Sequence, residues 1–415
     1  MNASPSAAPG HRVNTPAAVA VTLVLTALVL IFLLPNLWYG LHDVSDINVY
    51  QYYSQRMASG ERPFTKSFEV EYPPLAIPFF RLPGHATDVP AYTHWFTIDM
   101  GIITLLAAAV TTVTACRFWP RGGRAYVAAV LFPVGVALTG AIIVNRYDVV
   151  VALLIAAFLL CLSARWHVAA AFVLGMGFAL KLTPAALLPL VLILMGHPRR
   201  WVWAIVAFVA AAAAPFVPYL LQSPSGLWYV FQYHLERPLQ IESVLGTPMM
   251  IGRLLGVTHV AWAHSHGSHV MVATGAGLAA NLSGPLTLLV IAAVYLLVWR
   301  RREHVRESLA DQAVAVLALI LAIVTFGKVL SPQYFIWILP AWALVAARDK
   351  VIAILGGLTL LLTGIEFPYY YWMMLDMQKG PVGILVARNL MLIVTFGVTA
   401  WRLGKMAGDG PSEDQ

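Results

Sequence analysis

Charged side chains are scarce in this 415-residue sequence. Asp, Glu, Lys and Arg make up 11% of it and hydrophobic residues 60%, whereas soluble domains have about 25% and roughly 45–50%. Apolar runs of about 20 residues recur along the whole length, and each can cross a hydrocarbon core of about 30 Å. The composition therefore excludes an ordinary soluble domain and predicts an all-α, polytopic bundle of transmembrane helices.

Other features are missing as well. The two cysteines, Cys116 and Cys161, lie near the predicted cytoplasmic ends of spans, which argues against a structural disulfide. No small-residue cleavage site follows the first apolar run, so we expect an uncleaved span rather than a signal peptide. No internal repeat is visible, whereas transporters are often built from matching halves.

Twelve segments are predicted to span the membrane within one domain of residues 16–403. They are 17–38, 91–116, 125–144, 148–164, 167–180, 183–196, 201–221, 285–299, 310–327, 332–347, 351–366 and 382–402. The two segments flanking Lys181 to Pro184 are short, about 14 residues or roughly 21 Å each. They could form one broken pair that buries Lys181, so eleven to thirteen spans fit the pattern. Residues 1–15 and 404–415 are expected to be tails, the first of them disordered.

The distribution of Lys and Arg predicts the orientation. One alternate set of loops, together with Arg12, holds 15 of the 26 basic residues. Because Lys and Arg collect on the cytoplasmic side, both termini are expected there. The same rule accounts for the net charge of +7 without nucleic-acid binding. The loops 39–90, 222–284 and 367–381 then face outward.

Acidic residues concentrate in the first outer loop, directly after the first span. They are Asp43, Asp46, Glu61, Glu69 and Glu71. Ile47, Tyr50, Tyr53 and Met57 follow at helical spacing, which predicts a helix lying in the membrane interface with its aromatic edge in lipid. Asp43 and Asp46 are also suited to capping that helix. The proline-broken run from Tyr72 to Pro83 is too short to span.

Ionisable residues also recur at the outer ends of spans and in the second outer loop, where each is costly without a partner or a polar cavity. They are Arg146, Asp148, Lys181, Lys328, Glu366, His234, Glu236, Arg237 and Glu242, with Gln240 beside them. Separated cations suit an anionic ligand such as a lipid-linked phosphate. Carboxylates suit sugar hydroxyls, and one of them could act as a general base.

Plainer interpretations of the same residues stay open. Arg146 and Asp148 could form a structural ion pair, and Lys181 and Lys328 could reach to the interface as snorkelling side chains. Four histidines in the second outer loop resemble a metal-binding tract but also fit a loop with incidental histidines. They are His259, His264, His266 and His269.

Six motifs together resemble the GT-C superfamily of membrane glycosyltransferases, and within it family 87. They are SDINVYQYYSQRMASG, EVEYPPLA, NRYDV, KLTPAALLP, HLERPLQIES and GKVLSPQYFIWILP. That family includes polyprenyl-phosphate-mannose-dependent mannosyltransferases and related arabinofuranosyltransferases of actinobacterial envelope synthesis. The resemblance implies transfer of a sugar, with inversion, from a polyprenyl phosphate to a lipid-linked or glycan acceptor at the outer face of the bacterial cytoplasmic membrane.

The resemblance also implies roles for individual residues. Asp46 corresponds to the family's general base in the first outer loop. The donor phosphate would be held by Arg146, Lys181, Arg237 and Lys328, with His234 assisting. The rest of the cavity would be formed by Asp43, Glu71, Tyr72, Asp148, Glu236, Gln240, Glu242, Gln333 and Tyr334. The sequence has no DxD motif, so no metal and no other cofactor is expected. An arabinofuranosyltransferase on the same scaffold and a polyprenyl-linked glycan flippase are the alternatives.

Overall fold

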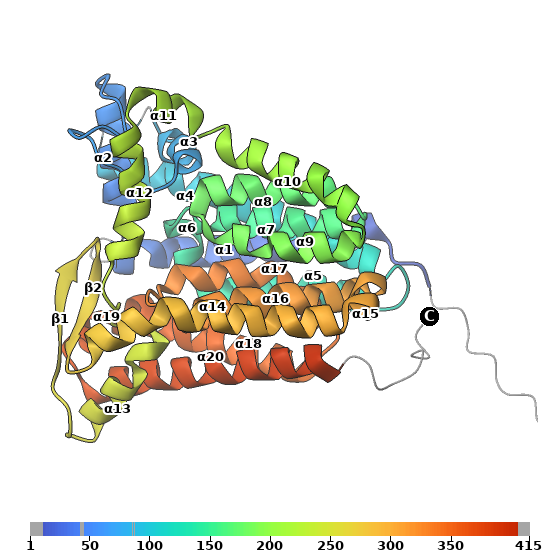
Figure 1. Cartoon of the computed structure of the whole chain (residues 1–415). Helices are drawn as coiled ribbons and strands as arrows, with labels where there is room; N and C mark the ends of the chain where they lie inside the picture. The colour runs from blue at the N-terminus through green and yellow to red at the C-terminus, as the bar shows by residue number, and fades with distance from the viewer. Residues whose placement is uncertain (1–10, 42–44, 85, 87, 406–415) are drawn as a thin grey trace, which may run out of the picture.

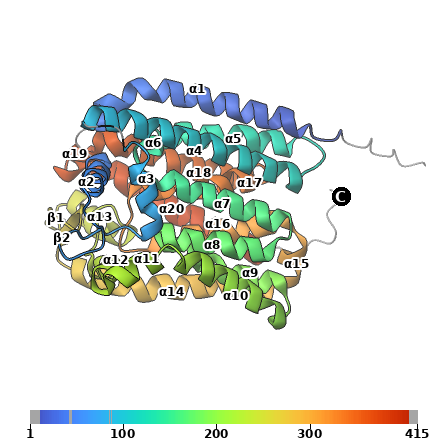
Figure 2. The same cartoon turned by 90° about the horizontal axis from the view of Figure 1, so that it is seen from above.

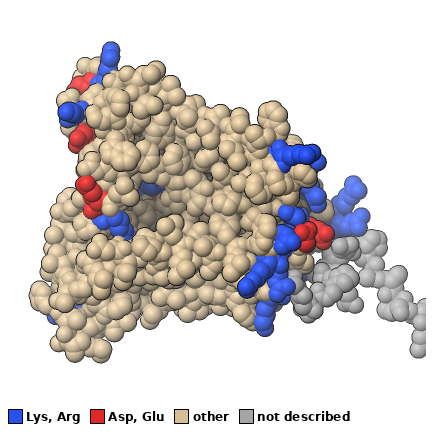
Figure 3. All heavy atoms as spheres, in the orientation of Figure 1, with Lys and Arg blue, Asp and Glu red and all other residues tan. Residues whose placement is uncertain are grey.

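The computed structural model describes residues 11–41, 45–84, 86 and 88–405. Its long helices lie side by side in one bundle with two distinct ends (Figure 1 and Figure 2). The hairpin end carries α2 (Ile47–Ala58), α12 (Pro224–Glu236) and an antiparallel hairpin of β1 (Val260–Ser265) and β2 (Ser268–Ala273). The basic end carries α15 (Arg302–Glu307), and Lys and Arg gather there (Figure 3).

A helix occupies each of the twelve segments predicted to span. These helices are α1 (Thr15–Leu41), α4 (Val89–Phe118), α5 (Arg124–Thr139), α7 (Asp148–Ser163), α8 (His167–Lys181), α9 (Leu188–Met195), α10 (Pro198–Ala213), α14 (Ala276–Arg300), α16 (Leu309–Phe326), α17 (Phe335–Ala346), α18 (Lys350–Ile365) and α20 (Lys379–Lys405). Within the described residues, six helices are long and apolar enough to cross a membrane. The all-α transmembrane class is confirmed, and the number of crossings stays a prediction.

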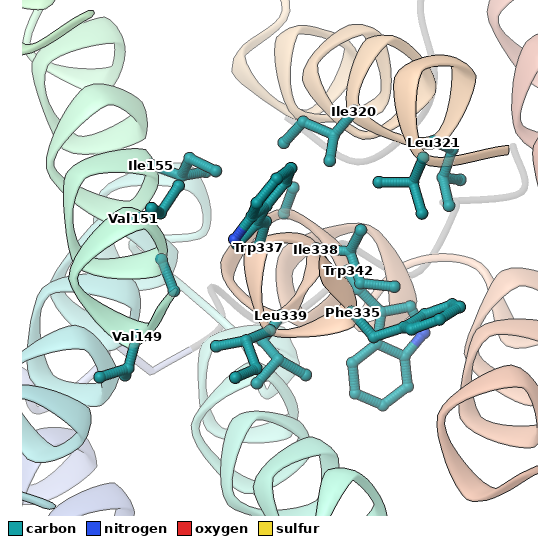
Figure 4. Close-up of a cluster of buried hydrophobic side chains, with 14 of the residues drawn as sticks. Val149, Val151, Ile155, Ile320, Leu321, Phe335, Trp337, Ile338, Leu339 and Trp342 are labelled. Atoms are coloured by element: carbon teal, nitrogen blue, oxygen red, sulfur yellow. The ribbon is translucent and has the colours of Figure 1, made fainter. Parts of the chain in front are cut away.

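Helix α17 forms the centre of the bundle. All of its residues are buried, and its large side chains pack against α7 and α16 (Figure 4). A Cβ atom at Gly135 of α5 would lie 2.8 Å from a methyl group of Leu339, and one at Gly356 of α18 would lie 2.3 Å from Nε1 of Trp342. Such small residues let helix backbones approach closely, which drives association where lipid replaces water.

Short elements near the hairpin end interrupt the regular helices. They are α6 (Ile142–Asn145), η2 (Thr183–Leu187), η4 (Pro332–Tyr334) and η5 (Glu366–Tyr370), with α19 (Tyr371–Leu375) after the last. Lys181 ends α8, and Leu182 has φ +55°, so the chain turns there before η2 and α9. Irregular backbone at membrane depth is tolerated where it lines a cavity, and these breaks surround the site described below.

The first outer loop and the segments before and after α12 hold further short helices. They are η1 (Pro74–Ala76), α3 (Ile77–Arg81), α11 (Val217–Gln222), η3 (Val244–Gly246) and α13 (Thr247–Leu254). The run from Tyr72 to Pro83 therefore forms only η1 and α3 and does not span, as predicted. The hairpin was not predicted.

Helix α2 forms where the sequence predicts a helix, but its predicted position is wrong. Tyr50 is fully buried and Tyr53 is 6% exposed, so the aromatic edge packs inside the protein rather than in lipid. The ring of Tyr50 stacks on Phe80 with centroids 4.5 Å apart and meets Tyr147 edge-on at 5.8 Å. Aromatic pairs of this kind add to the gain from burial, and here they attach the first outer loop to the bundle.

The predicted tails lie largely outside the described residues. Residues 11–14 are described, and backbone hydrogen bonds join them to the turn before α5: Val13 N–H donates to Pro120 O at 3.0 Å and Gly122 N–H donates to His11 O at 3.3 Å. The disorder predicted for residues 1–15 therefore does not extend to this part. Cys116 and Cys161 are free thiols.

Candidate active site

A cavity of about 730 Å³ opens at the hairpin end, between the first outer loop, α12, the hairpin and the interrupted helices. Figure 3 shows a hollow in this half of the molecule with charged side chains of both signs around it. Twelve of the predicted site residues line it: Asp46, Glu71, Tyr72, Arg146, Lys181, His234, Arg237, Gln240, Glu242, Lys328, Gln333 and Tyr334. Segments far apart in sequence thus converge at one depth of the bundle.

Three predicted residues are placed differently. Glu236 is exposed at the end of α12, where its carboxylate accepts a hydrogen bond from Gln232 Nε2 at 2.9 Å. Asp148 is fully buried behind the cavity wall. Asp43 lies outside the described residues, so its predicted capping role stays a prediction.

Asp46 forms an ion pair with Arg146. Its Oδ2 lies 3.1 Å from Arg146 Nε, and the side chains are 29% and 5% exposed respectively. Asp46 occupies the N-cap position of α2, but its side chain accepts no cap hydrogen bond; Ser45 Oγ accepts one from Ile47 N–H at 3.1 Å instead. The carboxylate is therefore left to face Arg146 and the cavity.

Asp148 pairs with Lys181. The alternative that Arg146 and Asp148 form an ion pair with each other is therefore wrong. Lys181 Nζ lies 3.1 Å from Asp148 Oδ1, and Trp337 Nε1 donates to the same oxygen at 2.8 Å. Four aromatic rings surround the ammonium group at 4.6–5.9 Å: Tyr72, Tyr147, Tyr334 and Trp337. Ring faces attract cations, so Lys181 is held at the cavity wall and does not extend to the membrane interface.

Arg237 and Lys328 have no acidic partner among the described residues. Lys328 Nζ donates to the Leu235 carbonyl at 2.6 Å, and the Arg237 guanidinium lies 5.7 Å from the centre of the Tyr233 ring. Burial and the charge of Arg237 lower the pKa of Lys328. Two neighbouring cations without a counter-charge favour the binding of an anion between them.

His234 lies beside these cations but is neutral at pH 7. Burial, followed by the charges of Arg237 and Lys181, lowers the pKa of His234 to about 4. A neutral imidazole has one donor and one acceptor nitrogen. Its assistance would therefore be a hydrogen bond rather than a third positive charge.

Two further carboxyl groups line the cavity. Glu71 accepts a hydrogen bond from the hydroxyl of Tyr53, and burial raises its pKa. Glu242 is 1% exposed and accepts from Gln240 Nε2 at 2.9 Å. Burial, and then the neighbouring carboxylate of Glu366, raises the pKa of Glu242.

The sequence analysis missed Arg388, which is fully buried in α20 and donates to the Glu242 carbonyl at 3.2 Å. A lone arginine inside an apolar run is the signal that could have found it, because intramembrane charges are rare and usually functional.

The hairpin supplies the remaining wall, and it was also missed. His264, His266 and His269 line the cavity from its strands and turn, while His259 precedes β1. Among the described residues no group of three or more His, Cys, Asp or Glu side chains could hold a metal ion. The short apolar runs 260–263 and 270–273 on either side of Gly267 were the available signal for a hairpin.

Comparison with known proteins identifies the family. The model of glycosyltransferase family 87 matches residues 71–332, and no curated protein matches the sequence. Among solved structures, ArnT from Cupriavidus metallidurans bound to undecaprenyl phosphate is similar, with 14% identity, a TM-score of 0.49, and coverage of 94% of this chain and 77% of that one. Its apo state gives 14% identity, a TM-score of 0.48, and coverage of 94% and 76%. Because the family match covers more than half of the chain, this multi-pass membrane protein belongs to glycosyltransferase family 87, as its motifs predicted.

Proposed function

We propose that this protein transfers mannose from a polyprenyl phosphate to a hydroxyl group of a lipid-linked or glycan acceptor, with inversion at the anomeric carbon. The reaction takes place at the outer face of a bacterial cytoplasmic membrane, with both termini in the cytoplasm. The gathering of Lys and Arg at the basic end supports this orientation.

The observation that carries the proposal is a partly exposed carboxylate in the same cavity as two cations that have no acidic partner among the residues described. Asp46 is 29% exposed, and Arg237 and Lys328 line the same space. An acid able to take a proton and a site suited to a phosphate are the two parts that this transfer needs.

The depth of the cavity suits a donor carried by a lipid. Part of its wall is apolar, with Ala186, Ile291 and Ile323 lining it from η2, α14 and α16. Helix α14 exposes Leu288 and Leu289 at 69% and 67% of their surface on the outside of the bundle. An isoprenoid chain can lie along such a surface while its phosphate reaches the cations, because apolar groups are more stable against other apolar groups than in water.

The proposed chemistry balances without a further reactant. The acceptor oxygen attacks the anomeric carbon while the bond from that carbon to the phosphate oxygen breaks, and the bonding electrons leave with the phosphate. Asp46 takes the proton of the acceptor hydroxyl. Arg237, Lys328 and Lys181 stabilise the charge that develops on the phosphate, and this is where fixed cations help catalysis most.

The flippase alternative is less well supported by the packing. The ring of Trp337 lines the cavity, and beneath it the fully buried residues of α17 fill the bundle (Figure 4). This arrangement supports chemistry on one side of the membrane rather than passage of a glycan through it.

The purified protein reconstituted in liposomes tests the proposal. Polyprenyl-phosphate mannose and polyprenyl-phosphate arabinofuranose are supplied separately with a set of lipid-linked acceptors, and radiolabelled products are separated by chromatography. We expect label to move from the mannose donor only. Transfer from the arabinose donor alone would show that the protein is an arabinofuranosyltransferase, and the assignment as a glycosyltransferase would stand. Movement of intact donor across the bilayer without transfer would overturn the enzyme assignment.

A further inference from the structure

The hairpin builds a second region of the cavity that differs chemically from the cationic one. We call it the hairpin rim and define it as Tyr233, His264, His266, His269 and Tyr371, all of which line the cavity. They come from α12, the two strands with their turn, and α19. None of them is an acid, a lysine or an arginine. The rim is therefore suited to a different part of the substrates than the phosphate.

The rim is held firmly on three sides. At the tip, His266 and Gly267 have φ of +49° and +60°, as a tight two-residue hairpin turn requires. The ring of His266 lies 5.1 Å from that of Tyr233, and a Cβ atom on Gly267 would lie 3.1 Å from the Tyr233 hydroxyl. The hairpin tip thus packs directly on α12.

The second strand anchors the other two sides. Ile241 N–H donates to His269 O at 3.1 Å and Met271 N–H donates to Leu239 O at 2.8 Å, so β2 is joined to the segment that carries Gln240 and Glu242. His269 Nδ1 and the Tyr371 hydroxyl share a hydrogen bond of 2.7 Å. Contacts on both edges keep the rim side chains in fixed positions, which is what discrimination between similar ligands needs.

The side chains of the rim have the properties that recognise a neutral sugar. His264 and His269 face one another across the strands with ring centres 5.8 Å apart. Burial, and then the charge of His264 when it is protonated, lowers the pKa of His269. Neutral imidazoles and phenols both donate and accept hydrogen bonds, as hydroxyl groups do, and their ring faces accept the apolar face of a sugar ring.

The rim also lies within electrostatic reach of Asp46. Burial, and then the negative charges of Glu71 and, more weakly, Asp46, raises the pKa of Tyr233. The apolar wall at Ala186 and Ile291 is formed by other elements, η2 and α14. The rim and the apolar wall are therefore separate parts of one cavity, which Asp46 also lines.

We propose that the hairpin rim binds the terminal, uncharged sugar of the acceptor and sets which acceptor is glycosylated. This inference rests on the proposed glycosyl transfer. It places the acceptor hydroxyl at the rim, beside the donor phosphate at Arg237 and Lys328, because the Arg237 guanidinium lies 5.7 Å from the ring of Tyr233 and Asp46 lines the same cavity.

The test uses full-length protein in detergent micelles, polyprenyl-phosphate mannose as donor and octyl α-D-mannopyranoside as acceptor. His264→Ala is expected to raise the KM for the acceptor about fivefold to tenfold, the loss typical of one or two hydrogen bonds, and to leave the KM for the donor unchanged. His259→Ala is the matched control, because His259 does not line the cavity; it should change neither value. An unchanged acceptor KM in His264→Ala, or equal rises for both substrates, would overturn the inference.

A binding measurement separates this inference from the proposed function. Saturation-transfer NMR of the octyl mannoside reports contact without any turnover. We expect a signal with the wild type and the His259→Ala variant and a weaker one with His264→Ala and Tyr371→Phe. If the wild type transfers no mannose, the proposed function fails, and the NMR comparison still decides the rim. Equal signals from all four proteins would overturn the rim as a sugar site.

Discussion

The two ion pairs that involve the residues on either side of Tyr147 have the same separation between charged atoms and different surroundings. Asp46 lies 3.1 Å from Arg146, and Asp148 lies 3.1 Å from Lys181. The carboxylate of the first pair is 29% exposed and that of the second is fully buried. In the first pair both groups line the cavity and the acid is the more exposed of the two; in the second only the cation lines the cavity and the acid is enclosed.

This difference between the two acids separates a chemical role from a positioning role. A carboxylate that faces the cavity can take a proton from a ligand, whereas a buried carboxylate can only hold its cation in place. Asp148 does this with help from Trp337, whose Nε1 donates to it at 2.8 Å. Buried pairs seldom stabilise a fold on balance, so the second pair is better explained by the need for a fixed ammonium group at the cavity wall.

The largest effect is expected from Asp46→Asn. Loss of a general base lowers kcat by about 100-fold to 10,000-fold, measured as transfer per molecule of folded enzyme. Glu69→Gln is the matched control, because Glu69 is an exposed acid of the same loop outside the cavity, and it should keep normal activity. Near-normal transfer by Asp46→Asn would remove Asp46 as the base and point to Glu71.

Asp148→Asn should act on stability first. Breaking a buried pair by removing one partner costs about 3–5 kcal/mol, because Lys181 keeps its charge at a site where its side chain is 13% exposed. Thermal unfolding in detergent measures the loss. The double variant Asp148→Asn/Lys181→Met should recover much of the stability and stay inactive. Recovery of both stability and transfer activity in the double variant would show that Lys181 has no part in the reaction.

His234 tests the region of unpaired cations through its pH dependence. Its pKa in the folded protein is about 4, below the ordinary 6.5 of an unfolded chain, so the folded state binds fewer protons between these values. The contribution of His234 to the free energy of unfolding is therefore fully present above pH 6.5. It is lost as the pH drops towards 4, by about 3 kcal/mol. His234→Gln should lose this dependence. Parallel curves for the two proteins over that range would contradict it.

Arg237→Gln is expected to have the smallest effect of the four. A lost charge-assisted hydrogen bond should raise the KM for the donor about tenfold or more, with a smaller change in kcat. Arg253→Gln, at an exposed arginine of α13, is the control and should leave the KM unchanged. If Arg237→Gln also leaves the KM for the donor unchanged, Arg237 does not bind the donor, and its segment either binds the acceptor or has only a structural role.

Much of the architecture could be predicted from the sequence because lipid leaves a helix few alternatives. The twelve apolar runs predicted to span all became helices, since a chain in hydrocarbon must satisfy its backbone hydrogen bonds within itself. The aromatic edge of α2 was wrongly assigned to lipid, because Tyr50 and Tyr53 fit an interfacial position and a packed one equally well by spacing alone.

The composition of the candidate site was predicted better than its connections. Most of the proposed residues line one cavity because each lies at the same end of a span. The sequence left a pair of Arg146 with Asp148, two residues away, as one alternative, whereas the structure pairs Arg146 with Asp46, a residue of the first outer loop. Arg388 and the hairpin rim were missed, since nothing local in α20 or in residues 260–273 shows what lies opposite them.

By itself the sequence determined the class of protein, the order of its helices and the end at which polar residues gather, because apolar length and charge act locally along the chain. Only the tertiary structure decided which acid meets which cation. Asp148 lies 33 residues from Lys181 and 189 from Trp337, and those distances are closed by helix packing. The same packing leaves Asp46 open to the cavity and encloses Asp148, and this contrast supports opposite roles for two otherwise similar ion pairs.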